Sequence, residues 1–393
     1  MGRRVVTALV AAAVALVPAV PGAATAEPAR ERAWSLPLPA AATGATNLRI
    51  TGSGLVYGHL GHADGTPHVA VWRGGGLREL APGAVTSFAY GANSAGLVVG
   101  QVAPAGAEPG YREAVAWLGG RTIDLAPEGS TGSAAVGVNN RGEVLVYSVF
   151  APGPDDTALP VRIAVWRHGR VTRVLYEGPE GTGIPLLGPA GHVAVVVPGA
   201  DGASSLRVWD PRGALVANAT QPTPYAVPFP LDLNSRGEVV MQSALGALGR
   251  VLVWREGGFT DIGLLPGAEA TDAHPTDFFL RDFINDTGEV VATSRTGATS
   301  RAFRWKDGKA TPLTPDPASY PQGINERGDV ALMTCPTPDT CTPQLITRTG
   351  PRAATGPTGT TTATVNAVHP HAPVVVGTAT TPPHARAVPY VRR

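Results

Sequence analysis

The sequence is poor in charge, and its two signs balance, which excludes one broad class of partner. Charged residues make up 16% of the chain, and 31 basic side chains against 30 acidic ones leave a net charge of +1. Only Lys306 and Lys309 are lysines. Proteins that bind nucleic acids or anionic membrane surfaces through phosphates carry a basic surface. We therefore expect neither partner for this chain.

Long hydrophobic runs are also lacking. The apolar run at residues 5–17 has 13 residues, well short of the roughly 20 that a membrane-spanning helix needs. It follows Arg3-Arg4 and precedes the small residues Ala24-Thr25-Ala26, which is the order of a secretory signal peptide. We predict a signal peptide over residues 1–26, exported by the Sec or the twin-arginine route, and a secreted chain over 27–393 without a membrane span.

Cysteine is almost absent, because Cys335 and Cys341 are the only two. In an oxidising exterior, two cysteines this close in sequence would form one disulfide that closes a tight loop. A zinc site is the alternative, but two thiols without a nearby histidine are a poor zinc ligand set. We predict the disulfide.

A polar element recurs along the mature chain. The pattern Asn-x-x-Gly-x-Val occurs complete five times, and degraded copies begin at Thr51, Gly188 and Asn366. The complete copies begin at Asn93, Asn139, Asn234, Asn285 and Asn325. An asparagine side chain can bond the backbone two residues on, and a glycine readily adopts a positive φ. We predict scaffold turns here, in preference to a ring of ligand-binding asparagines.

A second element, an apolar stretch that ends in tryptophan, alternates with the first. In most copies a glycine follows the tryptophan by three residues, and after Trp209 it follows by four. The tryptophans with this spacing are Trp72, Trp117, Trp166, Trp254 and Trp305. The same interval leads to Ile346 and Tyr390 in the last two units, which gives eight units whose anchor glycines lie 40 to 51 residues apart. We expect the tryptophans to be core residues between units.

Each unit is predicted to be four β-strands. Short apolar runs punctuated by Gly, Pro and Asn indicate strands, and no 3.6-residue apolar stripe occurs in the mature chain. Unit five divides into strands near residues 228–233, 238–242, 251–254 and 259–262. Eight such units are typical of an all-β β-propeller with eight four-stranded blades.

The two ends of the mature chain indicate a closed ring. Three residues follow Tyr390, so unit eight lacks a fourth strand, whereas an extra strand sequence beginning at Trp34 precedes unit one. We predict that this N-terminal strand completes the last blade. A seven-bladed propeller and an open β-solenoid are the alternatives.

The alternation of Ile-Asn-x-x-Gly-x-Val, at Ile284 and Ile324, with Ala-Val-Trp-x-x-Gly resembles the extracellular HAF-repeat proteins. The resemblance covers roughly residues 40–393, and the units around Gly54, Gly191 and Asn366 depart from it. It implies a secreted, propeller-like repeat protein. It implies no activity and supplies no catalytic residues.

Sharp catalytic motifs are lacking: the sequence has no Gly-x-Ser-x-Gly, His-Glu-x-x-His, P-loop or EF-hand pattern. His59 and His62 are not spaced to share one strand face. The pair His369 and His371 could share one side of an extended segment, but no third ligand is in view. We therefore predict no metal site and no cofactor.

The connector at residues 267–285 differs from its counterparts in the other units, because it concentrates both acids and aromatics. Its candidate ligand-binding residues are Asp272, His274, Asp277, Phe279 and Asp282. Carboxylates, a histidine and aromatic rings together suit a sugar or a cation. The alternative is a solvated connector with buried phenylalanines.

Loops of variable length should emerge on one face of the predicted propeller. They lie at residues 101–113, 148–162, 264–283 and 334–343. We expect function on that face, around the central channel.

Two classes of function remain. The missing catalytic motifs favour a monomeric binding or interaction module for an extracellular glycan, cell-wall polymer or protein. The alternative is a propeller-type glycoside hydrolase or lyase, which would need paired carboxylates about 5–10 Å apart near the channel.

Overall fold

The computed structural model describes residues 32–154, 158–199, 203–220, 222, 224–226, 229–273, 282–315, 318–337, 340–381 and 384–393. Arg32–Arg393 is one compact unit, and its described residues form β-strands without any helix. The predicted signal peptide, residues 1–26, lies outside the described residues. No described helix is long and apolar enough to cross a membrane.

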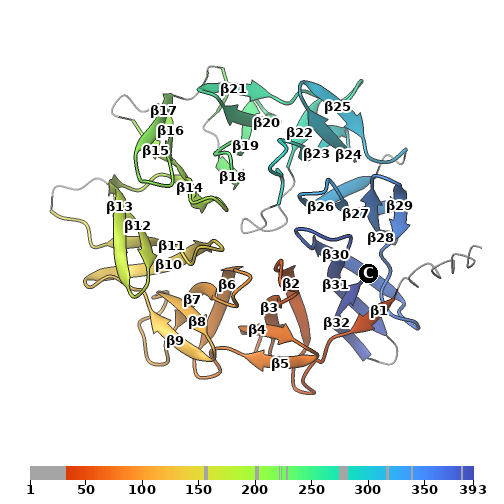
Figure 1. Ribbon diagram of the computed structural model, residues 1–393, viewed down its shortest axis with the longest axis horizontal. Coiled ribbons are helices and arrows are strands. Elements are labelled where there is room, and N and C mark those ends of the chain that lie inside the picture. The colour runs from red at the N-terminus through yellow and green to blue at the C-terminus, as the bar shows by residue number, and fades with distance from the viewer. Residues whose placement is uncertain are drawn as a thin grey trace, which may run out of the picture. The chain divides into compact units, whose positions relative to one another are not determined.

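The unit is a β-propeller in which each predicted repeat folds as a four-stranded antiparallel meander, here called a blade (Figure 1). The strands of blades one to four are β2 (Gly44–Ile50), β3 (Val56–Gly61), β4 (Pro67–Arg73), β5 (Gly76–Glu79), β6 (Thr86–Ala92), β7 (Val98–Ala103), β8 (Glu113–Leu118), β9 (Arg121–Asp124), β10 (Ser130–Val138), β11 (Val144–Phe150), β12 (Pro160–Arg167), β13 (Arg170–Pro179), β14 (Thr182–Leu187), β15 (Val193–Pro198), β16 (Ser204–Trp209) and β17 (Leu215–Thr220). Those of blades five to eight are β18 (Phe229–Leu233), β19 (Val239–Leu245), β20 (Leu248–Arg255), β21 (Gly258–Asp261), β22 (Ala270–Asp272), β23 (Val290–Thr296), β24 (Thr299–Lys306), β25 (Lys309–Pro312), β26 (Ser319–Ile324), β27 (Val330–Thr337), β28 (Thr340–Thr347), β29 (Gly350–Ala353), β30 (Thr362–Val368), β31 (Val375–Thr381) and β32 (His384–Arg392), with β1 (Ala33–Ser35).

The N-terminal strand closes the ring, as the sequence predicted. β1 pairs antiparallel with β32, so that Ala33 faces Arg392 and Ser35 faces Tyr390. Blades eight and one also share a single parallel pair, between Gly44 and Ala387. The hydrogen-bonded sheets therefore number seven, while the four-stranded meanders number eight. In Figure 1 the first strand of each blade lies nearest the centre and the fourth lies at the rim.

The tryptophan element forms the core between blades, as predicted. Trp72, Trp117 and Trp305 are each 1% exposed, and each pairs with the valine that follows the preceding turn, which begins with Asn93 or Asn285 in blades two and six and with Thr51 in blade one. In blade eight the residue in the tryptophan register is Arg392, which pairs with Val375. Tyr390 lies two residues earlier and is fully buried, so its predicted burial is confirmed and its predicted register is wrong.

The repeated asparagine closes its own turn and also binds the next blade. In blade six, Asn285 Oδ1 accepts the backbone N–H groups of Thr287 and Glu289, at 3.1 and 3.0 Å. Its Nδ2 donates to Glu289 Oε2 at 3.0 Å and to the carbonyl of Asn325 in blade seven at 3.1 Å. Asn93, Asn234 and Asn325 likewise donate to a carbonyl of the following blade. The predicted scaffold role is therefore confirmed.

The eighth copy of this turn is displaced from its predicted start. Its first residue is His369, whose carbonyl accepts the Asn325 amide, and not Asn366. Asn366 lies within β30, at a register shift between Val365 and Ala367. The sequence placed the turn three residues early because an asparagine inside a strand resembles a turn residue.

A buried hydroxyl supplies a second bond between blades, which the sequence analysis missed. Ser87 in β6 accepts the N–H of Val69 in β4 at 2.8 Å. Ser133 and Ser319 accept N–H groups of the preceding blade in the same way, each at 2.9 Å. Each serine stands six residues before the turn asparagine.

A β-bulge interrupts several inner strands shortly before the turn. The register shifts between Ala89 and Gly91 in β6, and between Pro321 and Gly323 in β26. In blade six, Asp272 pairs with Thr293, and the Val291 N–H donates to the Phe283 carbonyl at 3.0 Å. Bulges re-aim neighbouring side chains.

Cys335 and Cys341 form a disulfide between β27 and β28. The predicted pairing is confirmed, and it joins the two strands at the base of the hairpin loop.

Replacing the asparagine that binds the next blade should be costly. We expect Asn285→Ala to lower the free energy of unfolding by about 3 kcal/mol, because it leaves buried backbone groups of two blades without partners. Urea unfolding measures this. Asn218→Ala, at an exposed position on β17, should change stability by less than about 0.5 kcal/mol. Equal effects of the two variants would contradict the proposed role of Asn285.

Candidate functional site: a pocket at the channel mouth

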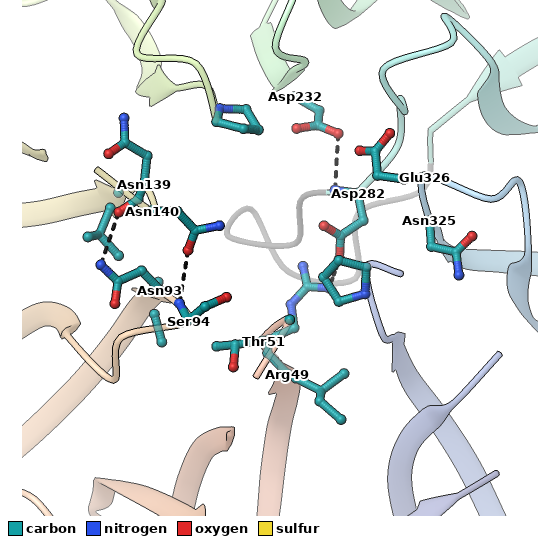
Figure 2. Close-up of a pocket in the computed structure, with 18 of the residues that line it drawn as sticks. Arg49, Thr51, Asn93, Ser94, Asn139, Asn140, Asp232, Asp282, Asn325 and Glu326 are labelled. Atoms are coloured by element: carbon teal, nitrogen blue, oxygen red, sulfur yellow. Dashed lines mark hydrogen bonds and ion pairs between the residues drawn. The ribbon is translucent and has the colours of Figure 1, made fainter. Parts of the chain in front are cut away.

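A pocket of about 250 Å³ opens where the inner strands end and their turns begin. All eight blades contribute to its lining. The contributors, one from each blade in order, include Thr51, Ser94, Asn140, Pro189, Asp232, Asp286, Glu326 and Pro370. Several point toward the central space in Figure 2.

The pocket lies at the opposite ends of the strands from the variable loops. The lining comes from the last residues of the inner strands and from the Asn-x-x-Gly turns. Loops such as residues 104–112, between β7 and β8, leave the other ends of these blades. The pocket therefore lies on the other face from most of the predicted variable loops, although Asp282, in the predicted loop 264–283, lines it.

An ion pair spans the pocket from blade one to the connector of blade six. Arg49 Nη1 donates to Asp282 Oδ2 at 2.8 Å, as Figure 2 shows. The Arg49 side chain is 11% exposed and that of Asp282 is 45% exposed. The carboxylate is therefore presented to the pocket while the guanidinium fixes its position from below the surface.

The backbone of Asp282 is held in an unusual conformation. Its φ is +91°, in the region that favours glycine. The carbonyl of Asp282 accepts the N–H of Ile324 in blade seven at 2.7 Å. Strained residues persist where the surrounding structure fixes them, and they cluster at functional sites.

Asp232 anchors the same connector from blade five. Its Oδ2 accepts three consecutive backbone N–H groups, at 2.7 to 3.0 Å, and Oδ1 accepts the N–H of Leu233 at 2.8 Å. The three donors are Asp282, Phe283 and Ile284. Asp232 is 8% exposed. A buried carboxylate with both oxygens occupied acts as a clamp and is poorly placed to transfer protons.

The residues after the turn asparagines form a second set of bonds between blades around the pocket. Ser94 N–H donates to Asn140 Oδ1 at 2.9 Å, and Ser235 N–H donates to Asp286 Oδ1 at 2.8 Å. Asp286 N–H donates in turn to Glu326 Oε2 at 2.9 Å. These side chains line the pocket and also bond the neighbouring blade, so the scaffold and the lining coincide.

Glu326 has an altered acidity. Burial raises the pKa of its carboxyl, the N–H of Asp286 opposes that rise, and the negative charges of Asp286 and Asp232 add to it. Its second oxygen makes no hydrogen bond within the described part of the chain. A carboxyl with a raised pKa at a pocket is a candidate for proton transfer.

The predicted connector residues divide between two places. Asp282 lies in the pocket. Asp272 does not: its Oδ1 accepts Gln242 Nε2 at 3.3 Å, and its Oδ2 lies 3.9 Å from Arg295 Nε. His274, Asp277 and Phe279 lie outside the described residues.

Sequence analysis missed Arg49, Asp232 and Glu326, although a signal for the first two was present. The position two residues before the turn asparagine is glycine in three blades: Gly91, Gly137 and Gly323. In blades one and five the same position holds Arg49 and Asp232. A charge in place of a repeated glycine marks a departure from the scaffold.

Neither of the two histidine pairs that the sequence raised lies together in one group of three metal-binding residues in the described part of the chain. His59 Nε2 accepts the N–H of Ala89 in blade two at 3.0 Å, so it bonds two blades. The His369 and His371 rings lie 6.3 Å apart, and no third ligand joins them among the residues described. A group that does fit a single ion is found elsewhere, on blade one, and consists of His62, His68 and Glu79.

Comparison with known proteins supports the fold and no more. No family model and no curated protein matches the sequence. A puromycin-hydrolyzing peptidase from Mycobacterium tuberculosis is similar in structure, with a TM-score of 0.51, 17% identity, and coverage of 90% of this chain and 62% of the peptidase. An acylaminoacyl peptidase from Pyrococcus horikoshii gives a TM-score of 0.51 at 10% identity, over 86% of this chain and 57% of that one.

A third similar structure is the β-propeller domain of the Trilobed protease from Pyrococcus furiosus. It gives a TM-score of 0.45 at 9% identity, over 91% of this chain and 96% of that domain. The chain spans only about three fifths of the two peptidases above, so the likeness identifies a propeller and transfers no activity.

The clamp made by Asp232 can be tested by its effect on the connector. We expect Asp232→Asn to destabilise the protein by about 2 kcal/mol, because charge-assisted bonds to three N–H groups are weakened. Amide hydrogen exchange should accelerate at Phe283 and Ile284. In Asp210→Asn, which alters a turn carboxylate bound to Arg212 and Ala214, faster exchange should stay within that turn. Unchanged exchange at Phe283 in Asp232→Asn would refute the clamp.

The raised pKa of Glu326 predicts a pH dependence of stability. The folded state holds this proton more tightly than the unfolded chain, whose pKa is the ordinary 4.5. The contribution of Glu326 to stability therefore falls as pH rises from that value through the raised folded pKa. In Glu326→Gln this fall should disappear, whereas Glu128→Gln, at an exposed position, should follow the wild type. Urea unfolding over a pH series measures this pH dependence. Identical curves of unfolding free energy against pH for Glu326→Gln and wild type would rule out the role of Glu326.

Proposed function

We propose that the protein is a secreted binding module that holds the polar end of an extracellular glycan or cell-wall polymer in the channel pocket. The observation that carries this proposal is the ion pair of Arg49 and Asp282 at the pocket. It combines a partly exposed carboxylate with a buried, fixed guanidinium. Paired donors and acceptors of this kind suit the vicinal hydroxyl groups of sugars.

The rest of the lining supports the same ligand class. Tyr57 and Tyr90 contribute aromatic rings to the lining, and an aromatic face can pack against the apolar face of a sugar ring. A volume of about 250 Å³ lies just under the roughly 300–1,000 Å³ of drug-sized sites. It suits one sugar ring or the end of a chain.

The location outside the cell rests on three observations. Residues 1–26 have the pattern of a signal peptide, and the only two cysteines form a disulfide, which is typical of oxidising compartments. The repeat also resembles the extracellular HAF-repeat proteins. We propose membership of that group on the alternating elements.

A second candidate, a propeller-type glycoside hydrolase or lyase, is favoured by Glu326. A carboxyl whose pKa is raised by burial is suited to act as a general acid. This candidate requires the same ligand class. It differs in that the bound glycan would be cleaved, and Glu326→Gln would abolish turnover while binding persists.

Calorimetric and thermal-shift titrations of the full chain with peptidoglycan fragments and soluble polysaccharides test the binding proposal. A ligand of the native state raises its melting temperature. We expect one glycan class to bind, and Arg49→Met and Asp282→Asn each to weaken binding by about 10–100-fold, since each removes a charged hydrogen-bonding group worth about 1.5–3 kcal/mol.

The matched control is Arg162→Met, which breaks an ion pair of similar length with Glu177, 2.6 Å, on the surface of blade three. It should leave glycan affinity unchanged. If no glycan shifts the melting temperature, the carbohydrate proposal fails in both its binding and its enzymatic form, and the pocket is left to protein partners. If the wild type releases glycan fragments and Glu326→Gln does not, the second candidate, the enzyme, is supported.

A further inference from the structure

Strand register brings three side chains with metal-binding atoms to one corner of blade one. His68 in β4 lies opposite Leu60 of β3, and Glu79 ends β5 opposite Ala70 of β4. His62 begins the turn between β3 and β4, where its N–H donates to the carbonyl of Thr66 at 3.1 Å. None of the three lines the channel pocket.

The side-chain atoms lie close enough to share one ion. His68 Nδ1 is 3.0 Å from Glu79 Oε1, and His62 Nε2 is 3.7 Å from Glu79 Oε2. One ligand atom from each residue falls within 4.8 Å of the others. Ligands bound to zinc at about 2.0–2.2 Å stand about 3.4 Å apart in a tetrahedron, so a small closing movement would complete the site.

The hydrogen bonds of Thr66 favour one tautomer of a neutral His68. Thr66 Oγ1 donates its one hydrogen to Asp64 Oδ1 at 2.6 Å, so toward His68 Nε2, 3.3 Å away, it can only accept. A neutral His68 therefore carries its proton on Nε2 and directs the lone pair of Nδ1 at the Glu79 carboxylate.

Two ring nitrogens of the cluster lack hydrogen bonds in the described part of the chain. They are His68 Nδ1 and His62 Nε2, and His68 is only 7% exposed. Buried polar atoms are normally satisfied. A buried lone pair that faces a carboxylate at 3.0 Å is repelled by it unless a positive charge lies between the two.

The donor set and the exposure select the kind of ion. Two imidazole nitrogens and one carboxylate suit zinc and related transition metals, whereas calcium and magnesium prefer oxygen ligands. The side chains of His62 and Glu79 are 31% and 24% exposed, so one side of the site faces solvent. A water molecule can therefore occupy a fourth position.

We propose that His62, His68 and Glu79 bind a zinc ion on blade one, with Thr66 as a positioning residue that fixes the His68 tautomer. Outer hydrogen bonds of this kind orient metal-binding histidines. The site is independent of the channel pocket and of the proposed glycan binding.

Zinc titration of the full, metal-stripped chain, in competition with a chromogenic chelator, tests the proposal. We expect one zinc per chain, and affinity losses of about 100-fold or more in His62→Gln and Glu79→Gln. Cobalt should give a tetrahedral absorption spectrum that these variants lose. Both residues are partly exposed, so the metal-free variants should melt near the wild-type temperature, which separates lost ligation from misfolding.

Three further variants complete the design. Thr66→Val should weaken zinc by about 10–100-fold and Thr66→Ser should restore it, which a merely structural role would not require. His168→Asn, at an exposed turn of blade three, should leave zinc affinity unchanged. Failure of the wild type to bind zinc would overturn the proposal and leave a protonated His68–Glu79 ion pair. Equal zinc affinity in wild type, His62→Gln and Glu79→Gln would also overturn it.

Discussion

The propeller depends on a directional bond between sheets that otherwise meet only through side-chain packing. The amide of Asn285 donates to the next blade's carbonyl, at 3.1 Å, while its oxygen closes the turn on its own blade. Packing of apolar faces fixes the distance between two sheets but tolerates sliding and rotation. A buried amide with all of its bonds made removes that freedom at the radius where the channel is formed.

The candidate site follows from this constraint. Because the turns of Asn93, Asn234, Asn285 and Asn325 are tied to the next blade, side chains beside them such as Asp286 and Glu326 are held in place around the channel. The candidate site lies where the repeat is broken. A glycine position becomes Arg49 in blade one and Asp232 in blade five, and both contact the inserted connector of blade six at Asp282.

Local and repeated features could be predicted from the sequence, and pairings between distant residues could not. The Asn-x-x-Gly turns, the buried tryptophans and the Cys335–Cys341 disulfide each rest on a few neighbouring residues. Arg49 and Asp282 stand 233 residues apart, and their pairing depends on the ring bringing blades one and six to a common channel. Asp272 and Asp282 look alike in the sequence, yet only Asp282 lines the pocket.

The contacts of the histidines could not be predicted for a related reason. His59 and His62 are close in sequence, but His59 is used between blades, and the partners of His62 come from strands β4 and β5. Cross-strand neighbours are fixed by register, which a single sequence indicates poorly when loop lengths vary. The same limit explains the displaced turn of blade eight, where Asn366 matched the motif and His369 holds the position.

Blade eight is a composite of the two ends of the unit, because β1 from the N-terminal end pairs with β32 from the C-terminal end. The N–H of Arg393 donates to the carbonyl of Arg32 at 3.1 Å, so the ends of the fold meet. Among the described residues no contact joins positions farther apart in sequence, and contacts of this kind slow folding because they close long loops. Without β1, the last blade would lack its fourth strand. In a circular permutant, the present two ends would be joined and new ends would be opened in another blade. That other blade would then be the composite one, while the channel stayed the same.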